Sequence, residues 1–479
     1  MNSTNIFLIA RQTRIQVLQQ KAMWVLMFLL AAIIGYAGIT GLLQYKKAEA
    51  TRIGYQQIVR KNWENNPDKH PHRMAHYGSI AFRPKSALSV FDYGLESYTG
   101  NAVFLEAHKQ NTTNFSEASL SSTMLRFGEI SIAMVLQLLL PLFIFFIGFN
   151  CISQDRENGT LKILISQGLH PLHLLAGRIL GIATVAAIVL IPAFLFTAVL
   201  QLFAASNSAV WLQLIIAFLI YTAGVLLYSG IAVLVSAWSN TSKLSLVLLM
   251  GIWLLMMIVL PRGTQTLANT IYSTPSKIAF ENGIDGDIIK EGDSHNPDDQ
   301  HYKGLKDSVL KANHAESVEQ LDFNYSGFQM AEAEKMSAQI YDRHLQRLIQ
   351  IYQRQNRLQV YAAFINPYLG IKQLSMAFSQ TDFNTYTQFQ QQTEAYRYAL
   401  AQAMNELQIK LIPNKKLAAT DKNYSIDKKY WACFHDFQYK APSFQLILQQ
   451  ELLAICSLVY WLLLVVALVL FTSKKINVI

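Results

Sequence analysis

Six long apolar runs constrain this 479-residue chain more than any other feature. The hydrocarbon core of a bilayer needs roughly 20 apolar residues in an α-helix, because each residue adds about 1.5 Å. The fifth run is short, and we expect its helix to end at Pro261. The sequence therefore predicts an α-helical polytopic membrane protein with spans at residues 23–43, 130–152, 179–203, 212–237, 244–260 and 452–471.

The Lys and Arg residues of the short connections predict the orientation, because they concentrate on the cytoplasmic side of membrane proteins. They occur before the first run, between the second and third runs, between the fourth and fifth, and in the tail 472–479, but not at 204–209. Both termini are therefore predicted to be cytoplasmic. The two long polar segments, 44–129 and 262–443, are predicted to be periplasmic.

The polar segments carry their own helical patterns. Residues 1–22 alternate apolar and basic residues at helical spacing, which predicts an amphipathic elbow helix before the first span. In the first long segment, 51–63 should continue the first span as a helix and 66–84 should be rich in turns. In the second, apolar stripes predict a long helix from Ser326 to before Pro367 and another over 385–411, so this domain is expected to be mainly helical.

Composition and motifs exclude several functions. The net charge is +9, but no tract of clustered Lys and Arg with interleaved aromatics favours nucleic-acid binding. The sequence has no phosphate-binding Gly-x-x-x-x-Gly-Lys-Ser/Thr stretch, no nucleophile elbow and no His-Glu-x-x-His. This predicts a chain that is not an enzyme, with no cofactor of its own.

A charged stretch follows the second run at once, and residues 153–178 connect that run to the third. It reads Asp155-Arg156-Glu157-Asn158-Gly159-Thr160-Leu161-Lys162. Such a segment cannot lie in hydrocarbon, so it should form a surface bend followed by a short amphipathic helix. One interpretation is an ordinary capped turn; the other is a docking element.

This stretch, together with Leu174-Leu175-Ala176-Gly177-Arg178-Ile179-Leu180-Gly181, resembles the motif of ABC-2 type transporter permeases. The resemblance implies six spans of the ABC-2, type V exporter-like, kind in a bacterial inner membrane. It also implies that 153–178 holds a coupling helix for two ATPase subunits, which carry ATP and Mg, and that a second permease copy or a paralogue completes the complex. The implied coupling residues are Asp155, Arg156, Glu157, Gly159, Thr160 and Leu161.

The long polar segments also resemble one bacterial branch of these permeases, whose outer domain is uncharacterised. The resemblance rests on stretches such as His72-Arg73-Met74-Ala75-His76-Tyr77-Gly78, Leu88-Ser89-Val90-Phe91-Asp92-Tyr93-Gly94 and Thr381-Asp382-Phe383. It implies an architecture and no particular substrate.

The hypothesis is a permease that couples ATP hydrolysis by a separate subunit to export, or extraction from the membrane lipid, of an unidentified substrate. The alternative keeps the fold but transmits force to a periplasmic or outer-membrane protein without moving a substrate. A membrane-anchored adaptor or metal-handling protein is a third class. Neighbouring genes for an ATPase and a second permease would argue against this last class.

Two further groups of residues are candidates for chemistry. Glu129 and Glu451 lie at the ends of spans, where a carboxylate at membrane depth favours a role in transport or gating; pairing in the headgroup zone is the alternative. His70, His72 and His76, with Met74, form a compact cluster. Imidazole and thioether bind copper or zinc, but Arg73 in their midst favours a structural turn, so no metal site is predicted.

Overall fold

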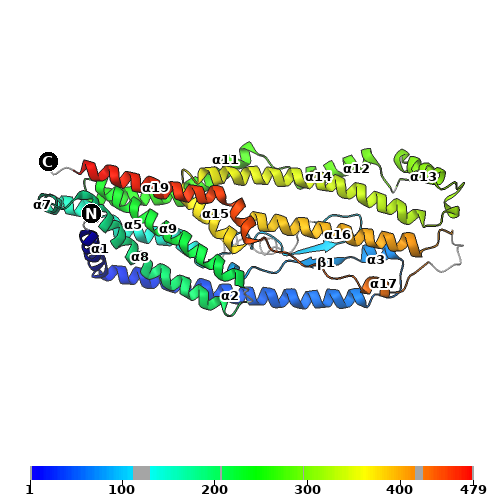
Figure 1. Cartoon of the computed structure of the whole chain (residues 1–479), viewed down its shortest axis with the longest axis horizontal. Coiled ribbons are helices and arrows are strands. Elements are labelled where there is room, and N and C mark those ends of the chain that lie inside the picture. The colour runs from blue at the N-terminus through cyan, green and yellow to red at the C-terminus, as the bar shows by residue number, and fades with distance from the viewer. Residues whose placement is uncertain (1–2, 112–129, 205–207, 295, 416–423, 477–479) are drawn as a thin grey trace.

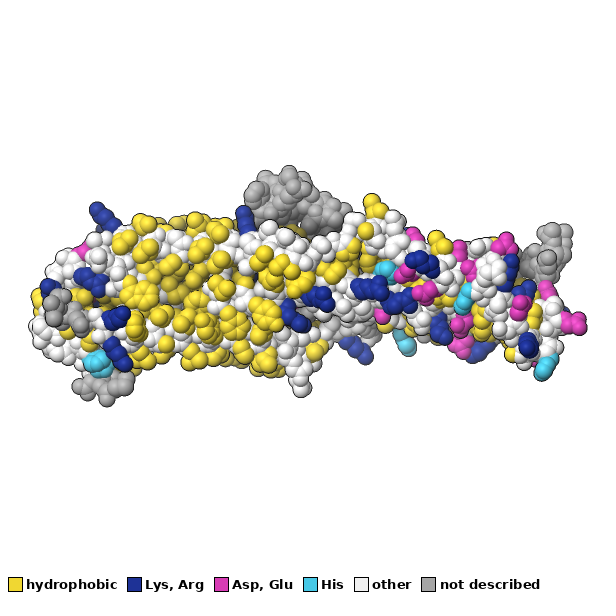
Figure 2. Space-filling model, turned by 90° about the horizontal axis from the view of Figure 1, so that it is seen from above, with side chains coloured by type: hydrophobic (Ala, Val, Ile, Leu, Met, Phe, Trp, Pro, Cys, Tyr) yellow, Lys and Arg dark blue, Asp and Glu magenta, His cyan; other side chains and the backbone are white. Residues whose placement is uncertain are grey.

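The computed structural model describes residues 3–111, 130–204, 208–294, 296–415 and 424–476. These residues form an elongated molecule whose helices mostly run along its long axis (Figure 1). Both ends of the chain and α7 lie at one extremity, the proximal end. On the face that Figure 2 shows, hydrophobic side chains cover much of the proximal half, whereas most of the acidic side chains gather on the other half.

Six of the described helical segments are long and apolar enough to cross a membrane, which confirms the predicted fold class. Many apolar side chains on their outer faces are exposed, which suits contact with lipid. The spans are α2 (Lys21–Glu64), the segment from α5 (Ile132–Gly148) through α6 (Ser153–Glu157), α8 (Pro171–Gln201), α9 (Ser208–Trp238), the segment from α10 (Ser242–Leu254) through α11 (Leu260–Ile271), and α19 (Leu452–Lys475).

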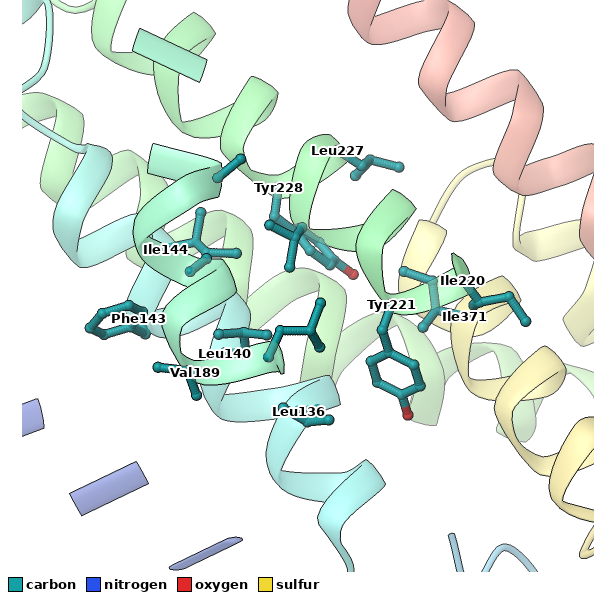
Figure 3. Packing of buried hydrophobic residues seen from close by; sticks show 14 of the residues in the cluster. Leu136, Leu140, Phe143, Ile144, Val189, Ile220, Tyr221, Leu227, Tyr228 and Ile371 are labelled. Atoms are coloured by element: carbon teal, nitrogen blue, oxygen red, sulfur yellow. The ribbon is translucent and has the colours of Figure 1, made fainter. Parts of the chain in front are cut away.

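The core of the bundle lies between α5, α8 and α9. Leu136 and Leu140 of α5, Val189 of α8 and Tyr221 of α9 converge there (Figure 3). The phenol of Tyr221 accepts a hydrogen bond of 2.7 Å from the Gln137 amide and lies 2.9 Å from the Ser375 hydroxyl, so its polar end is satisfied inside the core.

The predicted elbow helix is α1 (Ser3–Leu18), which turns at Gln19–Gln20 into α2. It packs against the start of α8 at two glycines. A Cβ on Gly177 would lie 2.6 Å from Ile9, and one on Gly181 would lie 2.6 Å from Thr13. Small residues four positions apart allow two helix backbones to approach closely in a membrane protein.

The fifth span differs from the prediction, because its helix does not end at Pro261. One turn of π-helix, η3 (Leu255–Val259), leads into α11, which continues to Ile271. Pro261 has no N–H to donate to the preceding turn. The Met256 carbonyl instead accepts a hydrogen bond of 2.7 Å from the side chain of Asn366. This contact comes from a residue that lies between two later helices, and it satisfies the carbonyl that the proline leaves without a backbone donor.

The distal domain is the half of the molecule away from the proximal end. It contains the end of α2, a two-stranded antiparallel sheet and several helices. In the sheet, β1 (Ser79–Phe82) pairs with β2 (Ala102–Leu105), with Ser79 opposite Leu105. Residues 66–84 are more regular than predicted, because Pro71 begins the helix α3 (Pro71–Tyr77). The 3₁₀ turn η1 (Ala87–Val90) follows β1.

The two long helices that the apolar periodicity predicted are both present in the distal domain. α14 (Tyr325–Ala362) packs along α16 (Phe383–Leu411), and α12 (Lys277–Glu291) covers another face of α14. Shorter elements complete this half: α13 (Gln300–Ala312), the 3₁₀ turn η4 (Val318–Gln320) and α17 (Lys429–Ala432).

One helix of the predicted outer range 262–443 lies in the membrane bundle. α15 (Pro367–Ser379) packs against α5, α9 and α19, and Leu374 and Phe378 are buried in the same core as the spans. α18 (Phe444–Gln450) then leads into α19. The chain between the fifth and sixth spans thus leaves the bundle through α11 and α12, and it returns along α14 into α15.

Candidate functional site

The α6–α7 loop, residues 153–168, protrudes at the proximal end (Figure 1). Its two short helices, α6 and α7 (Thr160–Ser166), are joined by a sharp bend at Gly159. Gly159 has a φ of +74°, in the left-handed region, and a Cβ added there would meet no heavy atom within 4 Å. The bend therefore requires glycine for its backbone conformation and not for space.

Asp155 ties the loop to two other helices. Its carboxylate forms an ion pair of 2.6 Å with Arg178, near the start of α8. The guanidinium of Arg178 also donates to Thr13 and Gln16 of α1, at 3.1 and 3.0 Å. Both members of the pair are largely shielded from water, so the pair fixes α6 on α1 and α8.

Arg156 and Glu157 connect the loop to the fourth and fifth spans. Arg156 donates to the carbonyls of Ser239 and, at 2.7 Å, Ala237, just where α9 ends. Glu157 accepts hydrogen bonds from the Ser242 amide at 3.1 Å and its hydroxyl at 2.6 Å, at the start of α10. A cation at a helix C-terminus and a carboxylate at a helix N-terminus both complement the helix dipole. These contacts bind α6 to both spans.

The charged residues of the motif thus contact their own chain, and α7 presents a different surface. Leu161 is buried, and Thr160 is half-buried. Lys162 is exposed, and Ile163 is 56% exposed at the proximal end. α7 therefore presents Lys162 and Ile163 to the surroundings at the proximal end.

A cavity of about 600 Å³ lies where the fifth span meets the distal domain. The π-turn η3 and α11 form one wall, and α14 and α15 form the other. The lining combines aromatic residues such as Trp253, Tyr352 and Tyr368 with the basic residues Arg262 and Lys372.

Two protein families match parts of the chain. Residues 95–280 match the family described as ABC-2 family transporter protein. Residues 278–440 match a domain of unknown function, DUF3526. By the first of these matches, residues 95–280 belong to the ABC-2 family of transporter proteins. No curated protein matches it.

The first match of this ABC-2 chain includes the α6–α7 loop, the cavity wall on the fifth span and the spans between them. The DUF3526 match includes α14, α16 and also α15, so it reaches into the bundle. The matches confirm the predicted family and leave the roles of individual residues as predictions.

Of the two predicted carboxylates at the ends of spans in this ABC-2 chain, the structure describes Glu451. It precedes α19, is 3% exposed, and accepts a hydrogen bond of 2.9 Å from Gln373, which lines the cavity. Glu129 lies outside the described residues. Sequence reasoning named Glu451 but not Gln373, because nothing along the chain indicates that α15 returns to the start of α19.

The histidine cluster has different members from those expected. His70 caps α3, and its Nδ1 accepts a hydrogen bond of 3.2 Å from the His72 amide. Met74 is fully buried in the distal core. His72 and His76 do lie together, but their third neighbour is His108, after β2. His70 has an extended backbone, and the helix α3 begins at Pro71 after it.

Proposed function

We propose that this ABC-2 chain is a permease subunit that couples ATP hydrolysis by separate ATPase subunits to export, or membrane extraction, of a substrate. The observation that carries the proposal is the α6–α7 loop. It protrudes at the proximal end and bonds directly to α8, to the end of α9 and to the start of α10, and it is linked through Arg178 to the elbow helix.

The loop would transmit force through its internal contacts. An ATPase pressing on α7 displaces α6, and α6 is bonded to α8 through Asp155, to the end of α9 through Arg156 and to the start of α10 through Glu157. The three connections are charged hydrogen bonds, which are the stronger kind. In this proposal Asp155, Arg156 and Glu157 attach α6 to the spans, and α7 makes the contact with the ATPase.

Two ATPase subunits, carrying ATP and Mg, would dock beneath two permease chains, either two copies or a copy and a paralogue. The spans would then change their tilt between two states, with ATP favouring one of them through differential contacts. The cavity beside η3 supports a path that leads out between the fifth span and α15, because π-turns frequently mark functional sites. Force transmission without substrate movement gains no support from the family match.

The docking surface can be tested with Ile163→Asp. The change places a charge on an exposed position, so the permease should remain folded in the membrane. ATPase association in the purified complex should fall at least 10-fold, since an unpaired charge buried at an interface costs several kcal/mol. The measurement is the ratio of ATPase to permease after purification, together with the rate of ATP hydrolysis.

The matched control is Gln12→Asp, which adds the same charge to an exposed position of α1 at the same end of the molecule. It should leave the ratio unchanged. A wild-type chain that binds no ATPase, or an Ile163→Asp variant that binds it normally, would refute the docking proposal.

The orientation gives a second prediction. Cys433 is exposed on the distal domain, so it should react with a membrane-impermeant thiol reagent in intact spheroplasts when Cys456, which is also exposed, is replaced by Ser. A cysteine at the exposed Asn158, in a chain otherwise lacking cysteine, should react only after the membrane is opened. The reverse pattern would show that the α6–α7 loop faces outward and would exclude its contact with a cytoplasmic ATPase.

A further inference from the structure

Three histidines from two parts of the distal domain meet at one point. His72 and His76 lie one turn apart on α3, so they share a face of that helix. Their Nε2 atoms are 3.2 Å apart. His108 follows β2, and one ligand nitrogen from each of the three rings lies within 4.8 Å of the others.

The spacing suits a metal ion. Zinc binds imidazole nitrogen at about 2.0–2.1 Å in tetrahedral sites, which places neighbouring ligand nitrogens roughly 3.3 Å apart. The His72–His76 separation of 3.2 Å already has that value. The ring centroid of His108 is 5.4 Å from that of His72 and 5.3 Å from that of His76, so the three rings lie close around one point.

The third histidine is held in the manner of a metal ligand. Its Nδ1 lies 3.0 Å from a carboxylate oxygen of Glu334, which also accepts the His108 backbone amide at 3.0 Å. Glu334 is itself fully buried and forms an ion pair of 2.7 Å with Arg397. A carboxylate on the second ring nitrogen fixes the tautomer and the orientation of metal-binding histidines. This contact assigns metal binding to Nε2 of His108.

The surroundings admit an ion from solvent. His76 is exposed, and His72 and His108 are half-buried at the same surface. Arg73, the neighbouring cation, is exposed, so water screens its charge. Three imidazoles with an open fourth position suit zinc, copper or nickel better than calcium or magnesium, which prefer oxygen ligands.

We propose that His72, His76 and His108 form a binding site for a divalent transition-metal ion, with Zn²⁺ as the probe. A bound ion joins α3 to the turn after β2 and, through Glu334, to α14. This inference is independent of ATPase coupling.

The test uses the full-length chain in detergent, stripped of metal with a chelator and titrated with Zn²⁺ against a chelating dye. We expect about one high-affinity ion per chain and a rise in melting temperature on binding. His76→Ala should weaken binding at least 10-fold and abolish the rise. Because His76 is exposed, the fold should be unaffected, which its unchanged melting temperature without metal would verify.

His435→Ala is the control, since His435 is an exposed histidine of the same domain outside the cluster. It should bind as the wild type does. Equal zinc affinity in the wild type and in His76→Ala, or no stoichiometric binding by the wild type, would overturn the proposal and would assign the three rings to a local hydrogen-bonding cluster.

Discussion

Gly159→Pro is expected to abolish productive coupling to the ATPase while the spans remain folded. Proline fixes φ near −65°, whereas Gly159 has a φ of +74°. The change also removes the Gly159 amide, which donates to the Arg156 carbonyl at 3.1 Å. α7 would therefore leave its position relative to α6. ATP hydrolysis by the assembled complex, measured with and without the permease, should lose its dependence on this chain.

A graded series separates backbone strain from steric exclusion at this bend. Asparagine tolerates the left-handed region and should retain most activity, whereas alanine should cost about 1–2 kcal/mol and lie between asparagine and proline. No atom lies within 4 Å of an added Cβ, so size alone should have no effect. Normal coupling in the proline variant would exclude the bend from the mechanism.

Glu334→Gln is expected to destabilise the distal domain by about 3–5 kcal/mol, the usual result of removing one partner from a buried charged pair. The fully buried carboxylate connects Arg397 of α16 with His108, and the variant leaves Arg397 with the Glu394 carboxylate and the Glu106 carbonyl. Hydrogen exchange of the α14 and α16 amides in the intact protein should become correspondingly faster.

The pKa of Glu334 implies that the stability of the distal domain depends on pH. Burial alone would raise the pKa of Glu334, but His108 and Arg397 together lower it from 4.5 to about 2. The folded state therefore binds the proton less tightly than the unfolded chain. The contribution of the Glu334 carboxylate to the free energy of unfolding is complete above pH 4.5 and is lost as the pH falls towards 2. The variant should lack this acid sensitivity.

Glu332→Gln serves as the control on the same helix, because that side chain is 39% exposed and pairs only with Lys335 at 3.6 Å among the contacts described. It should change stability by less than about 0.5 kcal/mol. Similar exchange rates in both variants would show that the Glu334 network does not hold α14 against α16.

Hydropathy was sufficient to predict the spans, because a bilayer imposes a length and a composition on each helix. Helical periodicity likewise predicted α14 and α16, whose apolar faces pack on each other. The path beyond Pro261 was not predictable from the local sequence, since it depends on the hydrogen bond to Met256 from Asn366, which lies 110 positions after Met256. The return of α15 into the bundle was not predicted from the sequence either. At 13 residues it is too short to read as a span.

In the candidate sites, too, local features were predicted from the sequence, whereas contacts between distant segments were not. The motif predicted a bend at Gly159, and the bend is present. The partners of Asp155 and Glu157 come from other helices, and no pattern within the motif indicates them. In the histidine cluster, sequence proximity favoured His70, whereas the third ring comes from His108, which reaches α3 only because β2 pairs with β1.

The burial of α15 also determines which segments can be exchanged between related proteins. A DUF3526 domain would be easy to exchange between relatives if it met the spans only through two flexible connections. Here it carries Tyr368, Leu374 and Phe378 into the core, and a Cβ on its Gly370 would lie 2.7 Å from Ser457 of α19. A chimera that exchanges this domain must therefore also exchange the facing residues of α9 and α19.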